Sequence, residues 1–249
     1  MRVAGEQAYA QLIDFTTTVS YRPRYFSFLC WALHKAFIAA GGREGAVEHF
    51  IDLAERVRAL KRYDFVMAAA TLAADPNAER IAGNRRIQRL LTSSGEDGTI
   101  PVTSDHLRAP HGSFDTYAGP MSELGLLRAA GGVTRPSALG MKLALAFERT
   151  LHACGGNEAF SADAIPLTDL LRIGELCGIS RFRSDEEVMR GEVHAEREAL
   201  RSVIIDFDGF HAHKVAVVNR LYSIAIILRL HEMTSAPTSA SRSDGDNGS

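Results

Sequence analysis

Two arginine-rich segments carry the side chains in this sequence that are best suited to binding phosphate. In the first, residues 21–28, Arg22 and Arg24 flank Pro23 among four aromatic residues. A guanidinium group can hold a phosphate through two parallel hydrogen bonds, and aromatic rings can stack on nucleic-acid bases. The commoner alternative is that the rings enter the core while the arginines pair with carboxylates or cap carbonyl groups. We take Arg22 and Arg24 as candidate nucleic-acid-binding residues.

The second segment contains four arginines within ten residues, namely Arg80, Arg85, Arg86 and Arg89. On a helix, positions 85 and 89 lie one turn apart on the same face and position 86 lies beside them. The segment therefore predicts a compact basic patch, in which Arg85, Arg86 and Arg89 contact phosphate groups. A solvated helix face that binds nothing is the usual alternative for such a charge run.

Two further groups of residues could carry chemistry, but neither has the spacing of a known site. Asp206, Asp208, His211 and His213 alternate acids with imidazoles, which are residue types that bind metals, but the favoured interpretation is that the carboxylates end one helix and cap the next. His152, Cys154 and Cys177 could supply a nucleophile and a base, although buried structural cysteines are the favoured interpretation. We therefore predict no catalytic residues, no metal site and no cofactor.

Composition and missing motifs argue in the same direction. The phosphate-binding loop of nucleoside triphosphatases, the dinucleotide-binding glycine fingerprint, the serine nucleophile elbow and the H-E-x-x-H zinc motif are all absent from the sequence. The 28 basic and 30 acidic residues give a net charge of −2, which argues against a globally basic nucleic-acid coat. Three cysteines make no disulfide framework. The chain is therefore more plausibly a binding protein than an enzyme.

Apolar periodicity predicts a mainly helical protein. The start of the chain lacks a signal-peptide pattern, and no apolar run reaches the length of about 18 residues needed to span a membrane, so we expect a cytoplasmic protein. The punctuated segment 92–113 predicts either a long loop between two halves or a loop with one short strand near residues 100–103. The predicted helices cover residues 24–40, 46–61, 63–74, 79–91, 114–123, 134–152, 167–176, 185–206 and 214–231.

These elements are divided into four regions. They are an N-terminal helical region over 1–92, a loop with a winged-helix-like module over 93–154, a C-terminal helical region over 155–233 and a disordered tail over 234–249. The helix over 214–231 is apolar on nearly every side, so we expect it to lie inside a core or an interface. The tail has no large apolar side chain to bury.

Residues 124–147 have the order of a winged-helix ending. The pattern predicts wing strands at 126–127 and 133–134 around a glycine turn, followed by a closing helix that Thr134 caps and that has Pro136 in its first turn. The recognition helix would then be 115–123, which carries Asp115 and Glu123 and no basic residue, whereas a helix that contacts DNA is normally basic. The module is accordingly interpreted as structural or as a protein-docking element.

Scattered motifs resemble a group of uncharacterised prokaryotic proteins found near restriction and phage-defence genes. The motifs are R-x-R-Y-x-S-F at residues 22–28, Tyr-Ala-Gly-Pro-Met at 117–121 and Glu-Arg-Glu-x-Leu-Arg at 196–201. The likeness extends over residues 15–230. It implies a defence-associated setting, and because members of that group are longer, it implies that this chain is a shortened form.

Taken together, these features favour a non-enzymatic, DNA-associated accessory protein. Its predicted partners are duplex DNA and either a partner protein or a second copy of the chain, with no membrane. The alternative is a protein–protein interaction or scaffold protein that never contacts nucleic acid, which the near-neutral charge supports. A hydrolase or nuclease that uses the Asp/His group at 206–213 is the third hypothesis.

Overall fold

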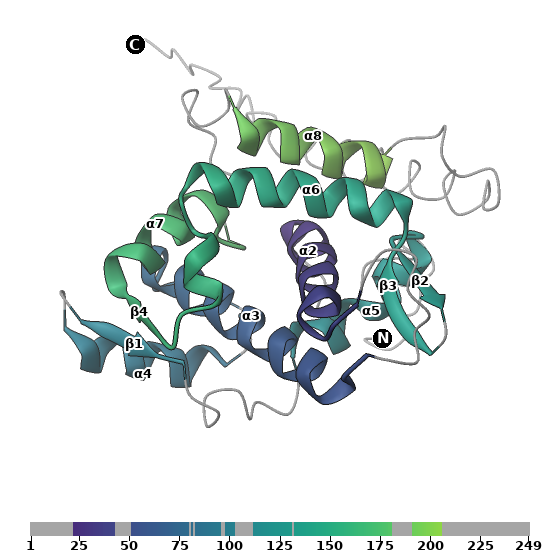
Figure 1. Cartoon of the computed structure of the whole chain (residues 1–249). Helices are drawn as coiled ribbons and strands as arrows, with labels where there is room; N and C mark the ends of the chain where they lie inside the picture. Colours follow the sequence, from purple (N-terminus) through teal and green to yellow (C-terminus); the bar gives the residue numbers. More distant parts are fainter. Residues whose placement is uncertain are drawn as a thin grey trace, which may run out of the picture. The chain divides into compact units, whose positions relative to one another are not determined.

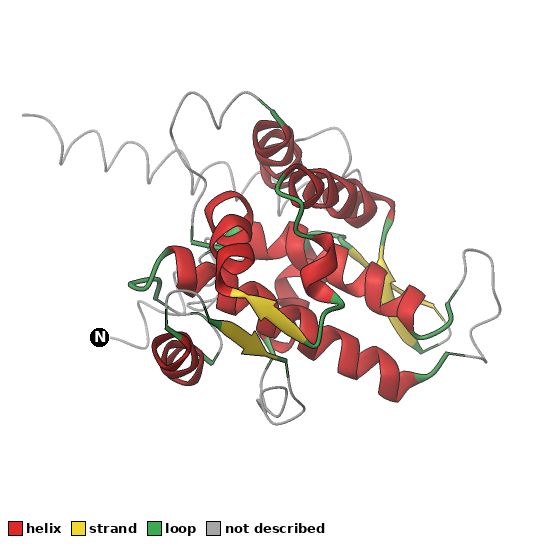
Figure 2. Ribbon diagram, turned by 60° about the vertical axis from the view of Figure 1, so that its left-hand side comes forward, coloured by secondary structure: helices red, strands yellow, loops and turns green. Residues whose placement is uncertain are grey.

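The computed structural model describes residues 22–42, 51–79, 81, 83–95, 98–102, 112–130, 132–180 and 191–205. This part of the chain is mainly helical, as predicted, with two short antiparallel two-stranded sheets that lie apart from each other (Figures 1 and 2). In order along the chain, the elements are α2 (Arg24–Ala39), α3 (Leu53–Ala74), α4 (Asn84–Ser94), β1 (Thr99–Pro101), α5 (Ser113–Glu123), β2 (Leu127–Ala130), β3 (Val133–Pro136), α6 (Ala138–Ala153), the 3-10 helix η3 (Asn157–Phe160), β4 (Ala164–Pro166), α7 (Leu167–Cys177) and α8 (Glu192–Ile205).

Helix α2 is the centre of the core. It packs against α3 and α6, while α8 packs on α6 and also contacts α2 (Figure 1). Its single tryptophan, Trp31, is 3% exposed. The Trp31 ring lies 5.3 Å from Tyr63 of α3, 5.6 Å from Phe147 of α6 and 4.8 Å from Phe160 of η3. This aromatic cluster joins four elements that are distant in sequence. Large aromatic side chains supply much of a core's hydrophobic stabilisation, so the cluster helps to hold these elements together.

Helix α3 shows that one sequence-based boundary is wrong. Two helices were predicted over 46–61 and 63–74, but α3 runs without a break from Leu53 to Ala74, while residues 46–50 lie outside the described part. The helix begins at Asp52, whose carboxylate accepts hydrogen bonds from the backbone N–H groups of Ala54 and Glu55. It continues through Arg62, because this residue is a good helix former and its guanidinium donates to the Phe160 carbonyl at 2.9 Å.

The predicted hairpin before α6 is present. Strands β2 and β3 pair antiparallel, with Ala130 opposite Val133, and Gly132 adopts a positive φ of 83° in the turn. The predicted cap of the next helix is wrong. Thr134 lies within β3 and Ser137 caps α6 by accepting a hydrogen bond from the Gly140 N–H, so Pro136 ends a strand instead of entering the helix.

The helix that precedes the hairpin is half buried. In α5, Tyr117 stacks 4.6 Å from the Tyr25 ring, and both rings are 3% exposed. Asp115 and Glu123 remain exposed. The order helix, hairpin, helix agrees with the sequence pattern, but a winged-helix module does not follow from this order alone and stays a prediction.

The regions predicted over 1–92, 93–154 and 155–233 contact one another where the structure describes them. Helix α3 packs on α7, and α6 packs on both α2 and α8, within one compact unit over residues 15–206. No helix in the described ranges has both the length and the hydropathy needed to cross a lipid bilayer. The helix expected over 214–231 and the tail over 234–249 lie outside the described residues.

Candidate functional site

The arginine patch predicted from sequence forms one face of α4. Arg85, Arg86 and Arg89 are all exposed, whereas Ile87, on the opposite side of the helix, is 4% exposed. At about 100° per residue, Thr92 falls on the same side as Arg85 and Arg89. We call Arg85, Arg86, Arg89, Thr92 and Ser93 the arginine face. Four of these side chains, together with Gln88, line a shallow depression on the surface. The four are Arg85, Arg89, Thr92 and Ser93.

The three arginines of this face make no ion pair among the described residues. Exposed arginines elsewhere do, namely Arg58 with Glu55, Arg149 with Glu192, Arg172 with Asp169 and Arg201 with Glu198. Helix α4 has no acidic residue of its own. Three guanidinium groups therefore point their donors at solvent, on a helix that carries no compensating charge.

Arg22 lies beside the segment that leads into α4. Its guanidinium donates to the backbone carbonyl of Glu79 at 2.8 Å, although 57 residues separate the two in sequence. Arg80, the fourth arginine of the predicted patch, is outside the described residues. The structure thus brings Arg22 close to the start of the arginine segment.

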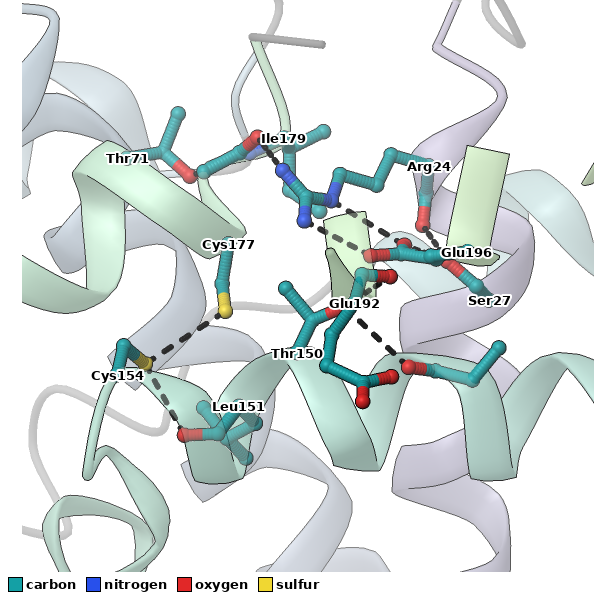
Figure 3. Close-up of polar contacts among 12 residues, drawn as sticks. Arg24, Ser27, Thr71, Thr150, Leu151, Cys154, Cys177, Ile179, Glu192 and Glu196 are labelled. Atoms are coloured by element: carbon teal, nitrogen blue, oxygen red, sulfur yellow. Dashed lines mark hydrogen bonds and ion pairs between the residues drawn. The ribbon is translucent and has the colours of Figure 1, made fainter. Parts of the chain in front are cut away.

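Unlike Arg22 and the arginine face, Arg24 is buried in the core (Figure 3). It is 1% exposed and its partner Glu196 of α8 is 0% exposed. Arg24 Nη2 donates to Glu196 Oε2 at 2.8 Å and Nε donates to Oε1 at 3.2 Å, while Nη1 donates to the Gly178 carbonyl at 3.3 Å. The Ser27 hydroxyl donates to Glu196 Oε1 at 2.5 Å. This is the alternative in which the arginine pairs with a carboxylate, so Arg24 is not part of a surface that nucleic acid can reach.

The electrostatics of Arg24 agree with this geometry. Burial alone would lower its pKa, but the charge and hydrogen bonding of Glu196, together with the nearby Cys177 and Cys154, outweigh burial, and the net pKa of Arg24 is raised. The ion pair joins α2 to α8.

Sequence analysis missed the role of Glu196, although a signal was present. The buried positions of α8 are Val193, Glu196, Leu200 and Val203, spaced by three, four and three residues. A carboxylate inside such an apolar stripe must find a buried cation. Its partner is 172 residues away in sequence, which is why spacing alone could not identify Arg24.

Two of the three cysteines face each other. The Sγ atoms of Cys154, just after α6, and Cys177, the last residue of α7, lie 3.7 Å apart (Figure 3). All three cysteines are free and buried. His152 instead contacts Asn157, at 2.5 Å from Nδ1, so the structure does not assemble the His152–Cys154 nucleophile pair considered from sequence.

A second group of arginines lies at the hairpin. Arg128 of β2 and Arg135 of β3 are directly opposite in register, and the Arg135 guanidinium lies 3.7 Å from the centre of the Phe37 ring. Burial, and then the charge of Arg135, lower the pKa of Arg56 on α3. Sequence analysis did not identify this group, because its members are drawn from three separate elements.

A hollow beside this group is lined by apolar and basic side chains. We call it the α2–α6 hollow, and its lining includes Ile38, Met141, Leu145, Arg128 and Arg135. Ile38 and Leu145 are 48% and 51% exposed, which is high for large aliphatic residues.

The Asp/His group at 206–213 lies outside the described residues, and no cluster of three or more potential metal ligands occurs within them. Comparison with known proteins adds no assignment, since no family model, curated protein or solved structure gives a significant match to this chain.

Proposed function

We propose that this protein is a non-enzymatic, DNA-associated accessory protein that contacts the phosphate backbone of duplex DNA through the arginine face of α4. The observation that carries the proposal is the exposure of Arg85, Arg86 and Arg89 on one side of a helix without acidic residues and without ion pairs among the described residues.

The chemistry of this face suits a sugar–phosphate backbone better than a base edge. Guanidinium and hydroxyl groups are common donors to phosphate oxygens, and the face supplies both through its arginines and through Thr92 and Ser93. Contacts of this kind carry no sequence information. We therefore expect binding that is independent of base sequence and strongly dependent on salt.

The test is a fluorescence-anisotropy titration of a labelled duplex with the full chain over a series of salt concentrations. Replacing Arg85, Arg86 and Arg89 together by Gln should flatten the plot of log K against log salt by roughly 2–3 units, because each neutralised phosphate contributes about 0.9 to the slope.

A matched variant separates local contact from overall charge. Replacing Arg58, Arg149 and Arg201 by Gln changes the net charge by the same three units, from −2 to −5, but removes arginines that already have carboxylate partners. Its slope should stay close to that of the wild type. Equal slopes in the wild type and both variants would remove the proposal, as would equally tight binding by the α4 variant.

The second candidate is a protein–protein interaction or scaffold protein, and the α2–α6 hollow favours it. Exposed Ile38 and Leu145 beside Arg128 fit an acidic segment with apolar side chains, from a partner protein or from a second copy of the chain. Sedimentation of the full chain measures self-association directly. If this candidate holds through a second copy, Ile38→Ser with Leu145→Ser converts an oligomer to a monomer and leaves DNA binding unchanged.

The setting of the protein rests on the sequence alone. We propose a cytoplasmic location, and the resemblance of residues 22–28, 117–121 and 196–201 leads us to propose a place in prokaryotic defence. Recovery of the protein from its native cell with DNA fragments would support the lead proposal, and recovery with a partner chain alone would support the second.

A further inference from the structure

The pair formed by Cys154 and Cys177 is a chemical feature that the proposed DNA contact does not use. The two Sγ atoms are 3.7 Å apart, although the two residues are separated by 23 positions in sequence. A disulfide bond is about 2.05 Å long, so the two sulfurs need to approach by roughly 1.6 Å to form one. We propose that Cys154 and Cys177 are a reversible disulfide site that hydrogen peroxide oxidises.

The reaction balances with one peroxide per pair. The Cys154 thiolate attacks one peroxide oxygen, the O–O bond breaks, and the product is a sulfenic acid on Cys154 with release of hydroxide, which takes up a proton as water. The Cys177 sulfur then attacks the sulfenic sulfur, a second water leaves, and the S–S bond forms. Two thiols are oxidised and the peroxide is reduced to two waters.

The surroundings of Cys154 favour it as the attacking sulfur. A hydrogen bond from the Cys177 thiol, the Gly156 backbone N–H and the charge of Arg172 lower the pKa of Cys154 to about 7, against the effect of burial. The same hydrogen bond and burial raise the pKa of Cys177 well above its ordinary value, so Cys177 keeps its proton until the second step. The thiolate is the form that reacts, and the lowered pKa favours it on Cys154 over Cys177.

The backbone is held by hydrogen bonds on both sides of the pair. After Cys177, the Gly178 carbonyl accepts from Arg24 and the Ile179 N–H donates to the Thr71 hydroxyl (Figure 3). After Cys154, the N–H groups of Gly155 and Gly156 donate to carbonyl groups of the last turn of α6. Closure therefore relies on rotation of the two cysteine side chains more than on movement of the backbone.

Burial selects the oxidant. Cys154 is 4% exposed and Cys177 is 0% exposed, so a bulky disulfide such as oxidised glutathione cannot approach in line, whereas hydrogen peroxide is little larger than water. The same burial makes intermolecular disulfides between folded chains sterically unfavourable.

The test is oxidation of the folded full chain by hydrogen peroxide, followed by removal of the peroxide, unfolding in urea, alkylation of the remaining thiols and mass spectrometry. The expected product has lost 2 Da and retains one alkylatable thiol, and it returns to three thiols when dithiothreitol is added to the unfolded chain. Trypsin without reductant should release residues 150–172 joined to residues 173–181, because Arg172 lies between the two cysteines.

Three single variants complete the test. Cys154→Ser and Cys177→Ser should each abolish the 2 Da loss, and Cys30→Ser, which removes a buried thiol outside the pair, should leave it intact. Circular dichroism of each variant is the control for folding. The proposal is overturned if Cys154 accumulates as sulfinic acid while Cys177 stays reduced, if disulfide-linked dimers form instead, or if all three thiols survive peroxide that oxidises the urea-unfolded chain.

Discussion

The buried ion pair between Arg24 and Glu196 allows a quantitative prediction for Glu196→Gln. The substitution keeps the shape of the side chain but removes the charge that three donors share, two from Arg24 and one from Ser27. Arg24 would then be a cation that is 1% exposed and that has lost its facing negative charge, while neutral acceptors such as the Gly178 carbonyl remain. Removing one member of a buried pair typically costs about 3–5 kcal/mol.

Urea unfolding followed by circular dichroism measures this cost as a change in the free energy of unfolding. The control is Asp169→Asn, which removes the partner of Arg172 in a pair whose side chains are 53% and 39% exposed. An exposed pair contributes about 0–1 kcal/mol, so the two carboxylate variants should differ by at least about 2 kcal/mol.

The double variant Arg24→Met with Glu196→Leu separates the two parts of the effect. It removes both charges and keeps similar volumes, so it should recover most of the stability that Glu196→Gln loses. If Glu196→Gln costs no more than Asp169→Asn, or if the double variant is less stable than the single one, the assignment of a desolvated, mutually dependent pair is wrong.

Three further substitutions test local features of the fold by the same unfolding measurement. Gly174→Ala should cost about 1–3 kcal/mol, because its Cβ would lie 1.9 Å from a backbone oxygen of α3, whereas Glu175→Ala beside it should stay within about 0.5 kcal/mol. Ser137→Ala should lower the free energy of unfolding by about 1 kcal/mol because α6 loses its cap, and Thr134→Ala should lower it by less than about 0.5 kcal/mol. A larger loss for Thr134→Ala than for Ser137→Ala would refute the cap assignment. Burial raises the pKa of Asp64, so the folded state binds the Asp64 proton more tightly than the unfolded chain does. The wild type should therefore lose stability relative to Asp64→Asn as the pH rises from about 3.9 through the raised pKa. A pH-independent difference would contradict that last prediction.

Helices with strong local signals could be predicted from the sequence. Pro23 before α2 and Gly41 after it, with a φ of +86°, fixed both ends of that helix, and the face formed by Arg85 and Arg89 followed from their spacing of four residues. The cap of α6 could not be predicted, because Thr134 and Ser137 are both good capping residues and the choice depends on how far the β3 pairing extends.

Long-range pairings account for most of what the sequence did not reveal in the candidate sites. Arg24 was a reasonable phosphate-binding candidate until its partner was known, since only tertiary packing brings Glu196 to it. The cysteine pair has the same origin, because α6 and α7 must pack before the two sulfurs can meet.

The most direct test of the central claim is chemical modification of arginines by phenylglyoxal with and without saturating duplex DNA, with the labelled sites read by mass spectrometry. The account predicts that duplex DNA protects Arg85, Arg86 and Arg89, while the exposed, ion-paired Arg149 and Arg201 are labelled equally in both conditions. Equal labelling of Arg85, Arg86 and Arg89 in the presence and absence of saturating duplex would contradict it.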